Sequence, residues 1–170
     1  MAFKVPPPPL DNPIYLDYRR WMIRALELAE AAGTAGDVPV GAVVVGPDGQ
    51  VIAEAANRRQ RDHDPTAHAE VLALRTAGQQ LGSWYLDHCT LYVTLEPCPM
   101  CAGAMINARL GQLVYGADDP KAGAVRSVLN LPDSAASNHR LPVVGGILGD
   151  VCQQQLQDWF IQHRRKTSEP

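Results

Sequence analysis

The sequence lacks an uninterrupted apolar run of the roughly 18 residues that a transmembrane helix needs. Its first residues, MAFKVPPPPLDNP, contain no long apolar core and no small-residue cleavage site, so we expect no secretory signal. Positive charge is not in excess either, because the formal net charge at pH 7 is −3, which by itself indicates no nucleic-acid partner. These absences predict a protein that does not bind membranes.

Cysteine is scarce, with four residues in the whole chain. Two of them form a C-x-x-C pattern, and nothing indicates export, so we expect a cytoplasmic protein without disulfides. In that reducing setting, Cys89 and Cys152 are predicted to be buried thiols.

The length of 170 residues and the hydrophobic fraction of 46% suit one domain with a sizeable core. We predict a single domain over residues 17–166 and a short tail over 167–170. Residues 1–16 are expected to form a disordered leader, because consecutive prolines at positions 6 to 9 favour extended polyproline II structure.

Helical and strand patterns alternate along the domain. A helix is expected over 17–32, and PVGAVVVGPDGQVIAEA predicts two strands joined by a tight turn. Further strands are expected at TLYVTL, at QLVYGA and within LPVVGGIL, with helices from about Pro65 and from Cys98 to about Ala108. The last helix should present one apolar face, formed by Cys152, Leu156, Trp159 and Phe160. This alternation indicates an α/β fold in which helices sandwich a mixed sheet.

Two segments place titratable side chains at the head of apolar helices. HDPTAHAEVLALR contains His68 and Glu70, and TLYVTLEPCPMC leads from a strand into two cysteines. Asp64 is a suitable N-cap and Pro65 a suitable first helical residue, which puts His68 and Glu70 in or near the first turn. Burying such a pair is unfavourable unless something pairs with it, so we expect the two segments to share one site.

Two thiolates and one imidazole are the ligands of a catalytic zinc site. Cys98 and Cys101 are spaced i, i+3 at a helix start, where partial positive charge favours thiolates. With His68 they supply three ligands of a tetrahedron whose fourth position is open to water. Zinc lowers the pKa of its bound water toward roughly 7, and a carboxylate beside it can carry the proton. We predict one Zn²⁺ per subunit, with Glu70 as the catalytic proton shuttle.

Two other interpretations of these residues stay open at this point. A C-x-x-C pattern after a strand also fits a redox dithiol, which would leave His68 and Glu70 unexplained. A closed structural zinc site would need a fourth ligand, for which Cys89, His88 and His63 are the candidates.

HAE followed by PCPMC resembles the H-x-E…P-C-x-x-C signature of zinc-dependent nucleoside and nucleobase deaminases. The resemblance extends to the bacterial tRNA-specific adenosine deaminases in six segments, which occur in the right order between about Tyr18 and Arg165. These segments are PVGAVVV, NRRQRDHDPTAHAEVLALR, TLYVTLEPCPMCAGAMINAR, YGADDPKAGA, NHRLPVVGGIL and CQQQLQDWF. The proline-rich leader departs from the family pattern.

The resemblance implies a cytidine-deaminase-like fold, a three-layer α/β/α sandwich with a roughly five-stranded mixed sheet, and a homodimer. It also implies hydrolytic deamination of adenosine to inosine at the wobble position of a tRNA anticodon stem-loop. Water attacks C6 in this reaction, and Glu70 carries its proton to N1 and then to the departing amine. Asn57 matches the family position whose amide meets the flipped-out base. The predicted substrate-binding residues are Asn57, Pro97, Asp119 and Lys121.

Alternative functions remain at this stage. The nearest share the chemistry and act on free cytosine, deoxycytidylate or guanine, while a non-catalytic zinc scaffold would have no use for Glu70. An RNA substrate also requires local positive charge on a chain whose pI is about 5.9. The candidate RNA contacts are Arg58, Arg59, Lys121, His139, Arg140 and the tail residues Arg164, Arg165 and Lys166.

Overall fold

A computed structural model describes residues 9–167, with side chains up to His163. Residues 1–8 of the predicted leader and residues 168–170 of the predicted tail lie outside the described residues. Among the helices that the structure describes, none combines the length and the apolar character that a membrane span requires.

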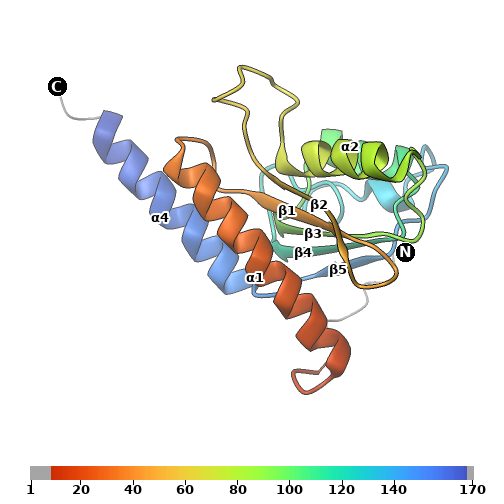
Figure 1. The fold of residues 1–170 in the computed structure, drawn as a ribbon. Coiled ribbons are helices and arrows are strands. Elements are labelled where there is room, and N and C mark those ends of the chain that lie inside the picture. The colour runs from red at the N-terminus through yellow and green to blue at the C-terminus, as the bar shows by residue number, and fades with distance from the viewer. Residues whose placement is uncertain (1–8, 168–170) are drawn as a thin grey trace.

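A five-stranded mixed sheet of order β2-β1-β3-β4-β5 forms the middle layer (Figure 1). Strand β1 (Gly41–Val45) pairs antiparallel with β2 (Val51–Ala56) on one side and with β3 (Thr90–Leu95) on the other. Strands β4 (Gln112–Ala117) and β5 (Val143–Gly145) continue the sheet parallel to β3. The predicted mixed five-stranded sheet is therefore confirmed.

Helices cover both faces of the sheet. Helices α1 (Pro13–Thr34) and α4 (Gly149–Thr167) lie side by side on one face, and α2 (Ala69–Leu81) and α3 (Pro99–Asn107) pack on the other (Figure 1). A short 3₁₀ turn, η1 (Leu131–Asp133), interrupts the long connection between β4 and β5. The predicted three-layer α/β/α architecture is confirmed.

The alternating direction of the side chains along β1 explains why the protein has an apolar core on each face of the sheet. Successive strand side chains point to opposite faces, so Ala42 and Val44 join the core under α2 and α3. Val43 and Val45 join the core under α1 and α4. All five residues of β1 are buried, as expected for a central strand covered on both sides.

The first helix begins at Pro13 and not at Asp17, so it extends into the predicted leader. Asn12 has extended backbone angles, and its Oδ1 accepts the N–H of Ile14 at 2.9 Å. Proline suits the first helical position because its missing N–H would be unpaired there anyway. This Asn-Pro start is the signal that the sequence interpretation missed.

Helix α2 begins at Ala69, so the predicted N-cap at Asp64 is wrong. The carboxylate of Asp64 instead accepts the backbone N–H of Thr66 at 2.8 Å and its hydroxyl at 2.7 Å, which forms a local turn. His68 takes the N-cap position, and Glu70 lies in the first turn, as predicted.

The predicted apolar face of the last helix is only partly right. Cys152 is buried, as is Cys89, which confirms the two predicted buried thiols. Trp159 packs on α1, where its Nε1 donates to the carbonyl oxygen of Gly33 at 3.0 Å. Phe160, however, is 44% exposed, because α4 rests on α1 and the sheet along a narrower stripe than its spacing suggested.

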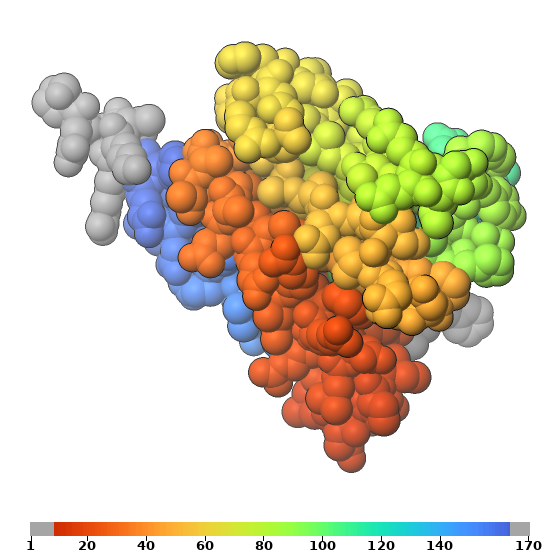
Figure 2. Space-filling view, in the orientation of Figure 1, coloured from red at the N-terminus to blue at the C-terminus, as the bar shows by residue number. Residues whose placement is uncertain are grey.

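Strand directions bring several chain segments to one edge of the sheet. Both β2 and β3 are antiparallel to β1, so they run in the same direction, and β4 is parallel to β3. The carboxyl ends of these three strands consequently lie at the same edge. The segments that follow them, residues 57–68, 96–98 and 118–130, meet there. Figure 2 shows the first of these, in yellow, projecting beside α2.

Candidate active site

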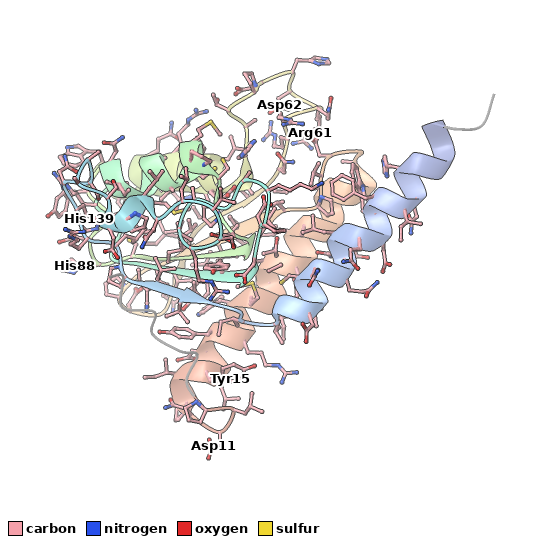
Figure 3. The ribbon with its side chains drawn as sticks, turned by 180° about the vertical axis from the view of Figure 1, so that it is seen from behind. Asp11, Tyr15, Arg61, Asp62, His88 and His139 are labelled. Atoms are coloured by element: carbon pink, nitrogen blue, oxygen red, sulfur yellow. The ribbon has the colours of Figure 1, made fainter. Side chains whose placement is uncertain are left out.

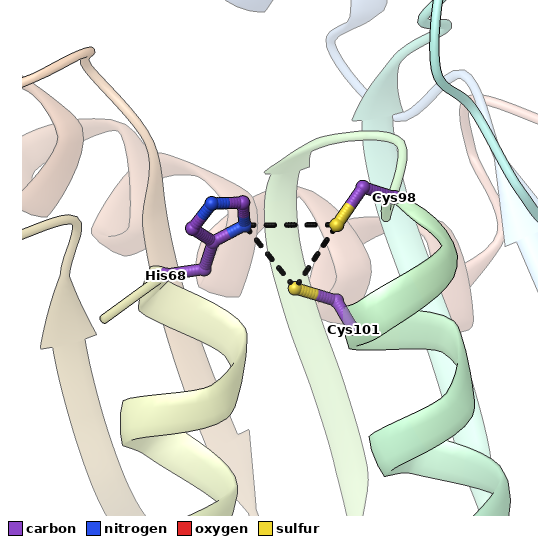
Figure 4. Close-up of side chains that lie close together, drawn as sticks. All are labelled: His68, Cys98 and Cys101. Carbon is purple, nitrogen blue, oxygen red and sulfur yellow. Dashed lines mark hydrogen bonds between the residues drawn. The ribbon is translucent and has the colours of Figure 1, made fainter. Parts of the chain in front are cut away.

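His68, Cys98 and Cys101 converge at this edge of the sheet (Figure 4). The two sulfurs lie 3.7 Å apart, and Nδ1 of His68 lies 3.7 Å from Sγ of Cys98 and 3.5 Å from Sγ of Cys101. Zinc bonds of about 2.3 Å to sulfur and about 2.0 Å to nitrogen, at tetrahedral angles, separate such ligand atoms by roughly 3.5–3.8 Å. The three side chains therefore could hold a metal ion without rearrangement.

Helix starts position all three of these side chains. His68 is the N-cap of α2 and Cys98 the N-cap of α3, each with extended backbone angles and without a side-chain capping bond. Pro99 occupies the first turn of α3, and Cys101 follows one turn after Cys98 on the same face. Because neither N-cap side chain is used for capping, both are available as ligands.

Cys89, His88 and His63 do not belong to this cluster. Within the described part of the chain, the side chains that could share one metal ion are those of His68, Cys98 and Cys101. Cys89 is buried in the core under α2 and α3, and the His88 side chain is exposed beside Asp87. Figure 3 shows His88 far from the loop that carries Arg61 and Asp62. The closed structural zinc interpretation therefore finds no fourth ligand among the candidates considered.

The side chains of His68, Cys98 and Cys101 perturb one another's protonation. Hydrogen bonds with Cys101 and with His68 lower the pKa of Cys98 to about 4. The hydrogen bond between the two sulfurs, together with burial, raises the pKa of Cys101, and the hydrogen bond to Cys98 raises the pKa of His68. On their own, these groups carry one thiolate at Cys98 and favour a nearby cation. A redox dithiol would not require the imidazole that both sulfurs contact.

Glu70 is buried next to these residues. Its side chain is 4% exposed, and this burial raises the pKa of its carboxyl group. A buried carboxylate whose pKa is raised, next to a metal-binding cluster, is typical of a general acid–base.

A cavity of about 180 Å³ is lined by Glu70, His68 and Cys98. Two of the four predicted substrate-binding residues, Asn57 and Asp119, line it, together with Glu96 and Arg59. The Nδ2 group of Asn57 donates to the carbonyl oxygen of Val38 at 3.1 Å, which holds the amide in place. The structure thus brings Asn57 and Asp119 to the same cavity as Glu70.

Pro97 and Lys121 are not among the residues that line the cavity. The carbonyl oxygen of Pro97 accepts the N–H of Ala124 at 2.8 Å, so Pro97 supports the neighbouring loop. Lys121 is exposed, and its backbone N–H donates to Asp119 at 2.9 Å. Their predicted contact with substrate stays a prediction.

Two buried carboxylates beside the site were missed by the sequence interpretation. Asp37 accepts the backbone N–H groups of Gln60 and Arg61 at 2.7 and 3.2 Å, which fixes the loop after β2. Glu96 accepts several backbone N–H groups of the loop after β4. For Glu96, a sequence signal existed, because the carboxylate directly follows the apolar strand TLYVTL.

Some of the candidate RNA contacts already form ion pairs within the protein, which would compete with binding of a phosphate. Arg58 forms an ion pair with Asp62 at 2.8 Å, and Arg140 forms one with Asp133 at 3.3 Å. His139 contacts the carbonyl oxygen of Leu110 and lies far from the Arg61 loop (Figure 3). Arg59 lines the cavity. The side chains of Arg164, Arg165 and Lys166 lie outside those that the structure describes.

Comparisons with known proteins agree with this geometry. The family of MafB19-like deaminases matches residues 16–164. A tRNA-specific adenosine deaminase from Haemophilus influenzae is 44% identical over 147 residues, which cover 86% of this chain and 85% of that protein.

Two solved structures share the fold. One, from work on A-to-I editing by tRNA:A34 deaminases at the wobble position of transfer RNA, has a TM-score of 0.78 and 43% identity, and the match covers 80% of this chain and 98% of that one. The other, a guanine deaminase from Nitrosomonas europaea, has a TM-score of 0.71 and 25% identity, with 87% and 92% covered. The high identity and the nearly complete coverage of both chains show that this chain belongs to the family of tRNA-specific adenosine deaminases.

Proposed function

We propose that this protein is a zinc-dependent hydrolase that converts adenosine to inosine at the wobble position of a tRNA anticodon. The observation that carries the proposal is the convergence of His68, Cys98 and Cys101 beside the buried Glu70, in a cavity lined by Asn57. Relatives that match nearly the whole chain bear the name tRNA-specific adenosine deaminase.

Zinc is the metal that this ligand set supports best. Two cysteine sulfurs and one imidazole nitrogen suit a borderline-soft cation, and their separations of 3.5 to 3.7 Å match tetrahedral zinc. Bound there, Zn²⁺ would supply Lewis-acid activation of water at neutral pH. A divalent cation would also hold Cys101 as a thiolate, against the rise in pKa that burial and Cys98 cause in its absence.

Glu70 moves the protons in the proposed reaction. It accepts the first proton of the attacking water and delivers it to N1 of the adenine ring. It then accepts the proton of the hydroxyl group formed at C6 and passes it to the amine, which leaves as ammonia. Burial raises the pKa of this carboxyl group, which makes the carboxylate a stronger base toward the proton of the water.

Asn57 orients the base in this proposal. Its side-chain amide has two N–H groups, and one is used by the carbonyl oxygen of Val38 at 3.1 Å. The second N–H remains to donate to a ring nitrogen of the substrate. Because Val38 holds the amide in one orientation, Asn57 presents a donor and not an acceptor to the base.

The size of the cavity indicates a single extruded nucleotide as the substrate. A volume of about 180 Å³ accommodates one base and not a stacked base pair. An anticodon loop offers unpaired nucleotides that can be splayed out at little cost. The wobble adenosine meets both requirements.

One assay tests the proposed function. An anticodon stem-loop with adenosine at the wobble position is incubated with the zinc-loaded protein, and inosine is measured. Free adenosine, cytidine, deoxycytidylate and guanine are tested in parallel, because a guanine deaminase shares the fold. We expect inosine in the stem-loop and no turnover of the free compounds. Turnover of a free base or nucleotide without stem-loop activity would contradict the proposal, as would no activity at all.

We also propose that the protein acts as a homodimer in the cytoplasm. A groove of about 680 Å³ between α2 and α3 is lined mainly by apolar atoms, and Trp84 at its border is 68% exposed. A second copy would remove this apolar surface from water. The mass of the particle in solution, measured by light scattering, tests the dimer.

The four free cysteines support the proposed cytoplasmic location, because they suit a reducing compartment.

A further inference from the structure

Glu96 ends the apolar strand β3 as a buried carboxylate that is 2% exposed. Its Oε1 accepts the backbone N–H groups of Arg126 and Ser127, both at 2.8 Å, and that of Val125 at 3.3 Å. Its Oε2 accepts the N–H of Asp119 at 3.0 Å and the hydroxyl of Ser127. Every one of these donors belongs to residues 119–127, which we call the wall loop.

The wall loop forms one side of the substrate cavity. Asp119 and Ala122 line this cavity together with Glu70 and Asn57. The loop has no strand or helix of its own between β4 and η1, so regular backbone pairing does not fix its position. Its backbone N–H groups need acceptors, and Glu96 provides the acceptors for four of them.

The fit between Glu96 and the wall loop is close. A Cβ atom added at Gly123 would lie 2.3 Å from Oε2 of Glu96 and 2.6 Å from the carbonyl oxygen of Asp119. Neither neighbour is the far end of a mobile side chain, since the carboxylate is held by its N–H donors. The loop backbone can therefore approach the carboxylate only because residue 123 is glycine.

Glu96 also stands two residues before Cys98, so one short segment joins the wall loop to the metal-binding helix start. Pro97 in that segment accepts the N–H of Ala124 at 2.8 Å. The hydrogen bonds described for the Glu96 carboxylate all go to the wall loop, and Asp37 anchors the loop after β2 separately. Glu96 therefore holds the wall loop in position, while other side chains carry out the proposed chemistry.

We infer that Glu96 is a positioning residue for the proposed reaction. It holds the wall loop against the cavity, so that the nucleotide finds a preformed site beside Glu70. A preformed loop lowers the entropic cost of substrate binding. This inference rests on the proposed deaminase function and adds a residue that acts through the loop and not on the reacting atoms.

Glu96→Gln tests the inference. Glutamine keeps the shape but replaces one acceptor oxygen by an NH₂ group, which faces backbone N–H donors and cannot accept from them. We expect the KM for the stem-loop to rise about tenfold while kcat stays within about twofold, the pattern of lost binding that is equal in ground and transition states. Amide hydrogen exchange in residues 119–127 should accelerate, and the zinc content should not change.

A second pair of variants covers the case in which Glu96→Gln does not fold. Gly123→Ala leaves the carboxylate in place but forces the wall loop away from it, so KM and hydrogen exchange should change in the same direction. Gly103→Ala is the matched control, because a Cβ atom at this position in α3 meets no atom within 4 Å. It should behave as the wild type does.

The outcomes separate the inference from the proposed function. An unchanged KM and unchanged exchange of the wall loop in Glu96→Gln or Gly123→Ala, with an active wild type, would overturn the role of Glu96 alone. A loss of kcat together with loss of zinc would also overturn it, because Glu96 would then support the metal site. An inactive wild type would contradict the proposed function, and the exchange rates would still report whether Glu96 anchors the loop.

Discussion

Nδ1 of His68 lies 3.5 Å from Sγ of Cys101, although the two residues are 33 positions apart in the sequence. The helices that carry them follow β2 and β3, which run in the same direction on either side of β1. A metal ion bound by these side chains would therefore link the starts of α2 and α3, which are far apart in the sequence. Stability and metal binding should consequently be linked.

Cys98→Ala and Cys101→Ala should each lose zinc. The wild type is expected to bind about one zinc ion per chain, and each variant removes one of three ligands. The thermal unfolding midpoint should fall in both variants, because the metal stabilises the folded state alone. Zinc content by elemental analysis checks this. Cys89→Ala is the matched control, since this buried thiol lies outside the cluster, and it should keep its zinc. Full zinc occupancy in either ligand variant would disprove the assignment.

Glu70→Gln should keep the fold and the zinc but lose turnover. The amide preserves the shape of the carboxylate but cannot accept a proton, and general acid–base catalysis typically contributes about 10²- to 10⁴-fold. The rate of inosine formation, measured with saturating stem-loop, should fall within that range. Activity within a few-fold of the wild type, at equal zinc content, would assign Glu70 a structural role only.

Asp37→Asn should loosen the loop after β2. Both carboxylate oxygens of this buried residue accept backbone N–H groups, and asparagine can accept only one of them. A buried donor without a partner costs about 1–3 kcal/mol in free energy of unfolding, and urea denaturation measures this loss. Asp48→Asn serves as the control, because its exposed side chain caps only the turn between β1 and β2. Equal effects of the two substitutions would contradict the anchoring role of Asp37.

Glu54→Gln should reduce stability in a pH-dependent way. The hydrogen bonds from Arg24 lower the pKa of Glu54 below its ordinary value of 4.5. A carboxyl group whose pKa is lower in the folded state stabilises the protein above about pH 4.5, and this stabilisation is lost as the pH falls through the folded-state pKa. Both side chains are partly exposed, so we expect about 1 kcal/mol or less at pH 7.

Paired thermal unfolding of the wild type and Glu54→Gln, at pH 7 and below pH 4, measures this difference. Loss of zinc at low pH affects both proteins alike and cancels in the comparison. The difference should be largest at pH 7, and a difference that grows at low pH would contradict the expected sign.

Arg59→Ala should weaken RNA binding and reduce its dependence on salt. Arg59 lines the cavity beside Asn57, so its guanidinium group is available to a phosphate of a nucleotide that enters the cavity. Removing one phosphate contact lowers the slope of log affinity against log salt by about 1. Arg24→Ala is a suitable control, since Arg24 is paired with Glu27 and Glu54 and is not among the candidate RNA contacts. An unchanged slope in Arg59→Ala would exclude Arg59 from the RNA contact.

Local chemistry in the sequence was sufficient to predict the fold class and the three side chains that the structure brings together as possible metal ligands. TLYVTL and QLVYGA were predicted as strands and are β3 and β4 to the residue, because apolar runs that are covered on both faces are unambiguous. PCPMC could be interpreted without a structure, because i, i+3 spacing at a helix start places both sulfurs on one face. HAE was interpreted through its resemblance to the deaminase signature.

Only the tertiary structure showed which distant segments form the cavity. The common direction of β2, β3 and β4 brings the segments after them to one edge, and the order β2-β1-β3-β4 makes these segments neighbours. No local pattern specifies either. The inferred role of Glu96 depends on this arrangement, because the N–H groups that its carboxylate accepts belong to a loop that is distant in the sequence. The start of α2 was also mispredicted from local pattern alone. Asp64 fits an N-cap by its residue type, but its carboxylate accepts the N–H of Thr66, and the helix begins only at Ala69. The helix propensities of most residue types differ by about 1 kcal/mol or less, so contacts between distant segments can outweigh them.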